Sequence, residues 1–152
     1  MSGHQNAELA KRFFDAVAAS DLVTIQSLLA DDAELTLPGS FSRAGVFKGR
    51  DEFLRGVGQL VEASDGTLRV ELLNTFVNGV DGDQVIGCYH GTGTVNREPL
   101  DEHNAFLMTC ANGVIVSMVD FYGDLVPRQT TFARFTSSQS SWSLAWRLRQ
   151  AM

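Results

Sequence analysis

The sequence predicts one α+β domain with a strongly curved antiparallel sheet, and three observations support this fold class. Helical periodicity of apolar residues is concentrated in the first 62 residues. Four long apolar and β-branched stretches follow between residues 67 and 122, separated by tight turn sequences. Helices that precede a run of strands favour α+β over an alternating α/β arrangement. The 152 residues show no internal repeat or linker, so a single domain is expected.

Three helices are predicted in the N-terminal part of the chain. The first has an apolar face that includes Phe13, with charged residues on its other faces. Asp21 is a favourable N-cap residue for a short second helix. The third carries an apolar stripe that includes Phe53 and is weakened by two glycines. The predicted helices span residues 7–19, 22–30 and 49–62.

The predicted strands begin after the second helix. Ala33, Leu35 and Leu37 alternate with polar residues, and Pro38 ends this first strand. The later strands are longer, and Asn- and Gly-containing turns separate them. Strands are predicted at residues 33–37, 67–77, 84–95, 100–110 and 114–122, with a loop and a short strand at 41–48.

Composition and charge exclude several classes of partner. The net charge of −6 argues against binding of nucleic acid or of anionic membranes. No stretch approaches the roughly 20 consecutive apolar residues of a membrane span. The N-terminal sequence lacks the pattern of a signal peptide, so a cytoplasmic location is expected. Cys88 and Cys110 are expected to be reduced core thiols without a nucleophilic role.

One carboxylate stands out in the last predicted strand. Asp120 follows an almost unbroken apolar run and precedes Phe121 and Tyr122. An ionised carboxylate away from water is costly unless it is paired or hydrogen-bonded. Asp120 is therefore expected either to line a pocket or to reach solvent at a strand end or subunit interface.

The order of these elements resembles the SnoaL-like branch of the ketosteroid isomerase and nuclear-transport-factor-like superfamily. Three segments carry the resemblance: FFDAVAASDLVTIQSLLADDAELTLPG, GVFKGRDEFLRGV and NGVIVSMVDFYGD. It covers residues 7–125 and leaves 126–152 as a C-terminal extension of the single domain. The resemblance implies a cone-shaped curved sheet with three helices across its mouth, an enclosed pocket, and commonly a homodimer.

The resemblance does not extend to the catalytic residues of the steroid isomerases. Their general base precedes the proline that closes the first strand, where this chain has Leu37. Their tyrosine oxyanion donor matches Phe13, and their protonated aspartate falls near Asn104 or Ala105. Ketosteroid isomerisation by that mechanism is therefore not expected.

The family's epoxide hydrolases and cyclases match better at the last strand. Limonene epoxide hydrolase-like enzymes hold a carboxylate at the position of Asp120, just before the aromatic pair. They also carry an Arg-x-Asp pair, whereas the matching stretch here reads GCYH. The matching groups that remain are Asp120 and, on another strand, Tyr89 and His90. This set resembles the His and Asp arrangement of SnoaL-type polyketide cyclases more than the site of the epoxide hydrolases.

The candidate chemistry is acid–base catalysis. A carboxylate in an apolar pocket can hold or accept a proton near neutral pH, and a histidine within reach can move the complementary proton. We therefore expect Asp120 to be the base, with His90 or His103 as its partner and Asp101 in a second polar cluster. Strand alternation places Asp101 and His103 on one face and Glu102 and Asn104 on the other. The sequence does not decide which of these two faces points inward.

The remaining site predictions concern the ligand. The substrate-binding residues are predicted to be Phe13, Leu37, Phe53, Tyr89, Asn104 and Tyr122. No cofactor or metal is expected, and Arg43 is predicted to be a solvated surface residue. Trp142 and Trp146 are predicted to lie on one face of a short C-terminal helix that caps the pocket or covers a neighbouring subunit.

These observations predict a small-molecule enzyme with cofactor-free acid–base chemistry on an apolar oxygenated substrate. Isomerase, cyclase, dehydratase and epoxide hydrolase reactions all fit the predicted groups. The alternative is a non-catalytic module on the same fold that binds a small ligand or acts as a dimeric interaction domain.

Overall fold

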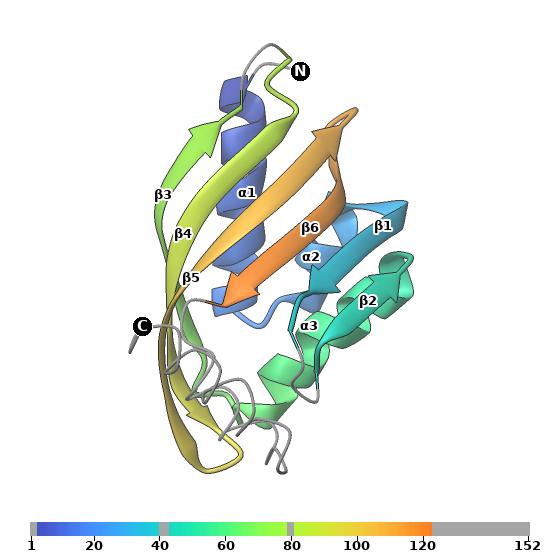
Figure 1. The fold of residues 1–152 in the computed structure, drawn as a ribbon. Helices are drawn as coiled ribbons and strands as arrows, with labels where there is room; N and C mark the ends of the chain where they lie inside the picture. The colour runs from blue at the N-terminus through green and yellow to red at the C-terminus, as the bar shows by residue number, and fades with distance from the viewer. Residues whose placement is uncertain (1–2, 40–42, 79–80, 123–152) are drawn as a thin grey trace, which may run out of the picture.

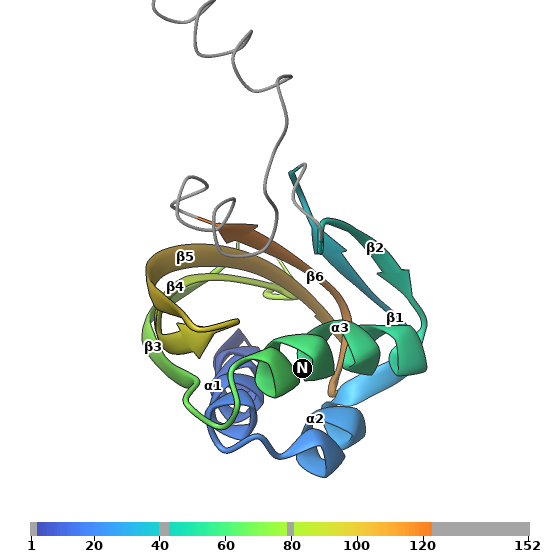
Figure 2. The same ribbon diagram turned by 90° about the horizontal axis from the view of Figure 1, so that it is seen from below.

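A curved, unclosed sheet wraps around three helices that cover its concave face (Figures 1 and 2). The computed structural model describes residues 3–39, 43–78 and 81–122. Within these ranges the helices are α1 (Gly3–Ala18), α2 (Leu22–Leu28) and α3 (Arg50–Ala63). The strands are β1 (Leu29–Leu37), β2 (Gly45–Lys48), β3 (Arg69–Val77), β4 (Gln84–Val95), β5 (Glu98–Ala111) and β6 (Val114–Tyr122). The predicted α+β class with a curved sheet is confirmed.

Local sequence signals explain where the elements begin and end. The Asp21 carboxylate caps α2 and accepts hydrogen bonds from the hydroxyl (2.6 Å) and backbone amide (3.0 Å) of Thr24, which lower the pKa of Asp21. β4 and β6 have the predicted bounds. β1 begins earlier than predicted, at Leu29, because the chain passes directly from α2 into extended backbone.

The strand order is β2-β1-β6-β5-β4-β3. Neighbouring strands are antiparallel except β1 and β6, which are parallel, so the prediction of a wholly antiparallel sheet is wrong at this pair. The β5–β6 hairpin turns through Asn112 and Gly113, and both residues have the positive φ of a two-residue hairpin turn. The β1–β6 pairing, by contrast, joins segments that are separated by α3 and four strands.

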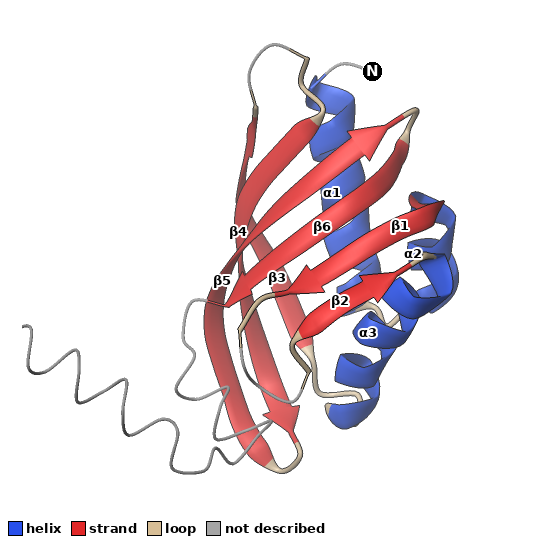
Figure 3. Ribbon diagram, turned by 45° about the vertical axis from the view of Figure 1, so that its right-hand side comes forward, coloured by secondary structure: helices blue, strands red, loops and turns tan. Residues whose placement is uncertain are grey.

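The core lies between the helices and the concave face of the sheet. α1 packs against β3 and β4, and α3 packs against β1 and β2 (Figure 3). The Phe14 ring of α1 lies 4.7 Å from the Phe106 ring of β5, and the Phe13 ring lies 6.1 Å from that of Phe53 in α3. Burying each such ring contributes about 1.5–3 kcal/mol, so these contacts fix the helices on the sheet.

The two cysteines lie in different environments. Cys110 is buried, and its burial, together with the nearby Asp83 carboxylate, raises the thiol pKa to about 11. Cys88 is only half-buried and lies on the outer face of the sheet, so its predicted place in the core is wrong. Both cysteines are free thiols.

None of the helices in the described part of the chain is long and apolar enough to cross a membrane. The predicted C-terminal helix around Trp142 and Trp146 lies outside the described residues.

Candidate functional site

A pocket opens between the helices and the concave face of the sheet. The space free of atoms, including the open mouth, is about 480 Å³. Most of the wall is apolar, and its polar side chains are those of Arg43, Tyr89, Asp120 and Tyr122. The apolar lining comes from α1, α3 and the strands: Phe13, Phe14, Val17, Leu35, Leu37, Gly56, Val57, Leu60, Val70 and Met118.

Asp120 is the carboxylate in this pocket. It is half-buried and lies opposite Phe106 in the β5–β6 register, on the inner face of the sheet. The Tyr89 hydroxyl of β4 lies 2.8 Å from each Asp120 carboxylate oxygen and donates its hydrogen bond to the carboxylate. The Tyr89 ring is itself held against Phe14, with ring centroids 4.9 Å apart. An apolar wall thus contains one carboxylate whose position is fixed by a charge-assisted hydrogen bond.

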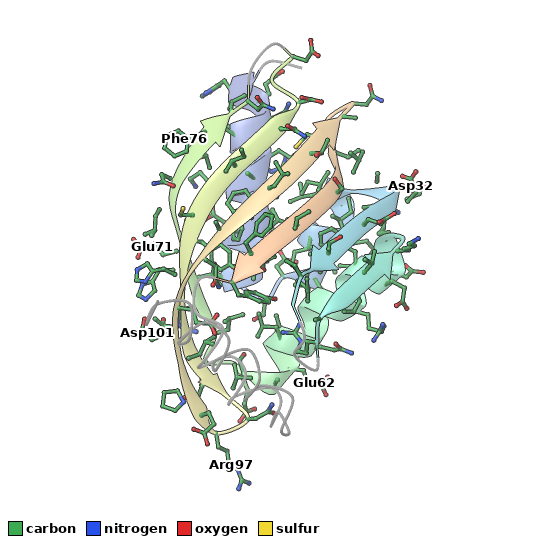
Figure 4. All side chains as sticks on the ribbon, in the orientation of Figure 1. Asp32, Glu62, Glu71, Phe76, Arg97 and Asp101 are labelled. Carbon is green, nitrogen blue, oxygen red and sulfur yellow. The ribbon has the colours of Figure 1, made fainter. Side chains whose placement is uncertain are left out.

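The expected contact between His90 and Asp120 is wrong. Successive residues of a strand point to opposite faces, so His90 points outward where Tyr89 points inward. On the outer face, His90 Nε2 lies 2.6 Å from Asp101 Oδ1, and its ring stacks on that of His103 with centroids 4.3 Å apart. Figure 4 labels Asp101 and Glu71 on the side of the sheet away from α3.

The structure resolves which face of β5 points inward. Glu102 is 1% exposed and Asn104 is 4% exposed, whereas Asp101 and His103 are exposed. The Asn104 side-chain amide donates to Glu102 Oε2 at 3.2 Å. Asp101 and His103, predicted as catalytic, therefore lie on the face opposite to the pocket.

Four of the predicted substrate-binding residues line the pocket and two do not. Phe13, Leu37, Tyr89 and Tyr122 are part of its wall. Phe53 is fully buried behind Phe13. Asn104 lies beside the pocket, opposite both Tyr89 and Tyr122 in the strand register.

Sequence reasoning missed two polar residues near this site. Arg43 was predicted as solvated surface, but it is half-buried, lines the pocket and donates from Nη2 to the backbone oxygen of Gly56. Glu102 is predicted only as a member of the polar cluster with Asp101, because both faces of this strand carry apolar residues further along and its inward face cannot be predicted. No group of three His, Cys, Asp or Glu side chains is placed to hold a metal ion in residues 3–39, 43–78 and 81–122.

Comparison with known proteins identifies the family to which this chain belongs. Residues 10–118 match the family model described as the SnoaL-like domain. The chain is 34% identical over 133 residues to Rv0034 of Mycobacterium tuberculosis, described as uncharacterized, and the match covers 88% of this chain and all of the relative.

Solved structures share the fold. Bal32a, from a soil-derived mobile gene cassette, is 26% identical with a TM-score of 0.79, covering 86% of this chain and 98% of that protein. Rv0760c of Mycobacterium tuberculosis, solved in complex with estradiol-17β-hemisuccinate, is 16% identical with a TM-score of 0.68. The match covers 78% of this chain and 94% of that protein. On the extent of the family match and of the Rv0034 similarity, this chain belongs to the SnoaL-like family.

Proposed function

We propose that this chain is a cofactor-free acid–base enzyme that acts on a mostly apolar, oxygen-bearing ring compound. Asp120 is the group that accepts and returns a proton. The observation that carries the proposal is the Tyr89–Asp120 hydrogen bond inside an otherwise apolar pocket. Carboxylates in such surroundings are suited to proton transfer, because the apolar wall can hold a substrate carbon against the carboxylate.

The proposed reaction begins at a carbon next to a ketone. Asp120 removes a proton from that carbon, and the electron pair of the broken C–H bond moves onto the ketone oxygen to give an enolate. Arg43 and Tyr122 line the same pocket and are the candidate hydrogen-bond donors to that oxygen. Where a C=C bond is conjugated with the enolate, return of the proton from Asp120 to the far carbon of that bond shifts the double bond and completes an isomerisation. Alternatively, the enolate carbon attacks a second carbonyl, and the oxygen of that carbonyl takes the proton from Asp120 to complete a cyclisation.

The ligand complex of a protein with the same fold supports the proposed substrate class. Rv0760c was solved with a steroid ester, which is an apolar ring system with oxygens at its ends. The pocket of this chain has matching chemistry: an apolar wall, and polar groups confined to a few positions.

The second candidate is a binding protein without catalysis. One observation favours it: the Tyr89 hydroxyl lies at the same distance from both carboxylate oxygens of Asp120, so the carboxylate can serve as a fixed acceptor for a ligand hydroxyl. Such a protein would bind the same ring compounds and leave them unchanged.

An exchange experiment in D₂O tests the proposed function. We expect the wild-type chain to exchange the protons next to the carbonyl of cyclic ketones, as detected by mass spectrometry, faster than buffer alone. Binding of the same ketones without exchange would favour the binding protein. Neither exchange nor binding across the panel would refute both candidates.

We also propose that the chain forms a homodimer through the outer face of the sheet. Phe76 and Ile86 lie opposite each other there and are 65% and 45% exposed, and Phe121 is 46% exposed on β6. Two copies that each carry a net charge of −6 repel each other, and these exposed apolar residues form the part of the outer face where contact costs least.

Light scattering after gel filtration checks the dimer. We expect the wild type to have twice the mass of one chain and Ile86→Lys to have the mass of one. The control Val23→Lys, on the 79% exposed Val23 of α2, should remain dimeric. A monomeric wild type, or an Ile86→Lys variant that stays dimeric, would contradict the proposal.

A further inference from the structure

One aromatic side chain reaches across the sheet to the carboxylate of the pocket. Tyr89 belongs to β4 and Asp120 to β6, and β5 lies between these two strands. The backbones of strands on either side of a shared neighbour are about 10 Å apart, so only a long side chain with a polar tip can bridge them. The adjacent inward residues of β4, Gly87 and Gly91, have no side chain. Tyr89 is therefore the residue of β4 that can contact Asp120.

The Tyr89 ring is held in place from the helix side of the pocket. Tyr89 is 7% exposed, and its ring centroid lies 4.9 Å from that of Phe14 in α1. The Phe14 ring packs in turn on Phe106, which is opposite Asp120 in the strand register. A ring packed in this way has few accessible rotamers, so the position of its hydroxyl is set before a ligand enters.

The hydrogen bond favours one protonation state of Asp120. The Tyr89 hydroxyl lies 2.8 Å from each carboxylate oxygen, and a hydroxyl binds an ionised carboxylate more strongly than a neutral carboxyl group. Hydrogen bonding to the charged form favours ionisation, whereas an apolar wall opposes it. Asp120 must be ionised to accept a proton from carbon, so the Tyr89 contact widens the pH range in which the base is available.

The effect of the Tyr89 hydroxyl can be separated from that of other charges. Among the described residues, the other ionisable side chains on the walls around Asp120 are Arg43 and Tyr122 in the pocket and Glu102 on the inner face of β5. The parts of α1 and α3 that line the pocket contribute only apolar side chains and a glycine. A substitution that removes only the Tyr89 hydroxyl leaves all these groups in place.

We propose that Tyr89 is the positioning residue of Asp120, and that its hydroxyl holds the carboxylate in the ionised form inside an apolar pocket. The inference rests on the proposed function, in which Asp120 is the base. It assigns Tyr89 an effect on the pH range of the reaction, exerted through Asp120 and not through contact with the reacting atoms.

Titration of Asp120 in a Tyr89→Phe variant tests this role. Phenylalanine keeps the ring against Phe14 and removes only the hydroxyl. The pH at which Asp120 is half-protonated should rise by about one to two pH units, because the ionised form loses a hydrogen bond to a charged group. ¹³C NMR of the side-chain carboxyl groups measures this pH, with the Asp120 signal assigned by its loss in Asp120→Asn. The exposed Asp21 carboxyl at the start of α2 is the internal control and should titrate identically in both proteins.

The pH profile of ketone proton exchange provides the second readout. A protonated Asp120 cannot accept a proton, so kcat falls as the pH decreases, and in Tyr89→Phe this fall should begin about one to two pH units higher. At pH values above both midpoints, kcat of the variant should approach that of the wild type. A kcat reduced equally at every pH would indicate a merely structural role and overturn the inference, as would an Asp120 midpoint that stays unchanged or falls. If the wild type exchanges no ketone protons, the proposed function fails, whereas the NMR titration still decides whether Tyr89 holds Asp120 ionised.

Discussion

Asp120→Asn is expected to lower kcat for ketone isomerisation or proton exchange by about 10²- to 10⁴-fold. The asparagine side chain has nearly the same shape as aspartate, and its amide oxygen can still accept the Tyr89 hydroxyl hydrogen bond. It cannot take up the substrate proton. The loss should therefore appear in kcat, whereas thermal stability and ligand binding remain close to those of the wild type.

The control for this experiment is Asp32→Asn, which makes the same chemical change at an exposed residue of β1. Its kcat should equal that of the wild type. An Asp120→Asn variant that retains wild-type turnover would remove Asp120 from the mechanism, whatever its position in the pocket.

Gly87→Ala is expected to destabilise the fold by about 2 kcal/mol or more, as overpacking of a tight core does. The added Cβ would lie 2.5 Å from the backbone oxygen of Asn74 and 2.7 Å from the Phe106 ring. Neither group can move freely, because the oxygen belongs to the β3 backbone and the ring is fully buried against Phe14. Urea unfolding gives the difference in the free energy of unfolding.

Gly91→Ala is the matched control, because Gly91 lies on the same strand and face but has space for a methyl group. Its free energy of unfolding should change by no more than about 1 kcal/mol in either direction. Equal destabilisation by the two substitutions would contradict the close packing of Phe106 over Gly87.

The sequence predicted those parts of the fold that depend on local signals. The bounds of β4 and β6 follow from their apolar and β-branched composition and from turn residues such as Asn112 and Gly113, which favour a tight hairpin. The pairing of β1 with β6 could not be predicted in this way, because it joins residues that are far apart in the sequence.

The site was predicted only in part, for the same physical reason. Asp120 could be singled out because a carboxylate is unusual in an apolar strand. Its partner could not, because the choice between Tyr89 and His90 depends on which face of β4 points inward, and one step along the strand reverses the answer. The inward position of Glu102 could not be predicted for the same reason, because Ala105 and Leu107 on one face of β5 are as apolar as Phe106 and Met108 on the other.

In the proposed mechanism, the reacting part of the substrate lies against the Asp120 carboxylate. A crystal structure of the chain with a bound cyclic ketone tests it most directly. We expect the carbon next to the carbonyl to lie within about 3.5 Å of an Asp120 oxygen, with the ring against the apolar wall. A ketone bound elsewhere, or bound in the pocket with its carbonyl turned away from Asp120, would contradict it.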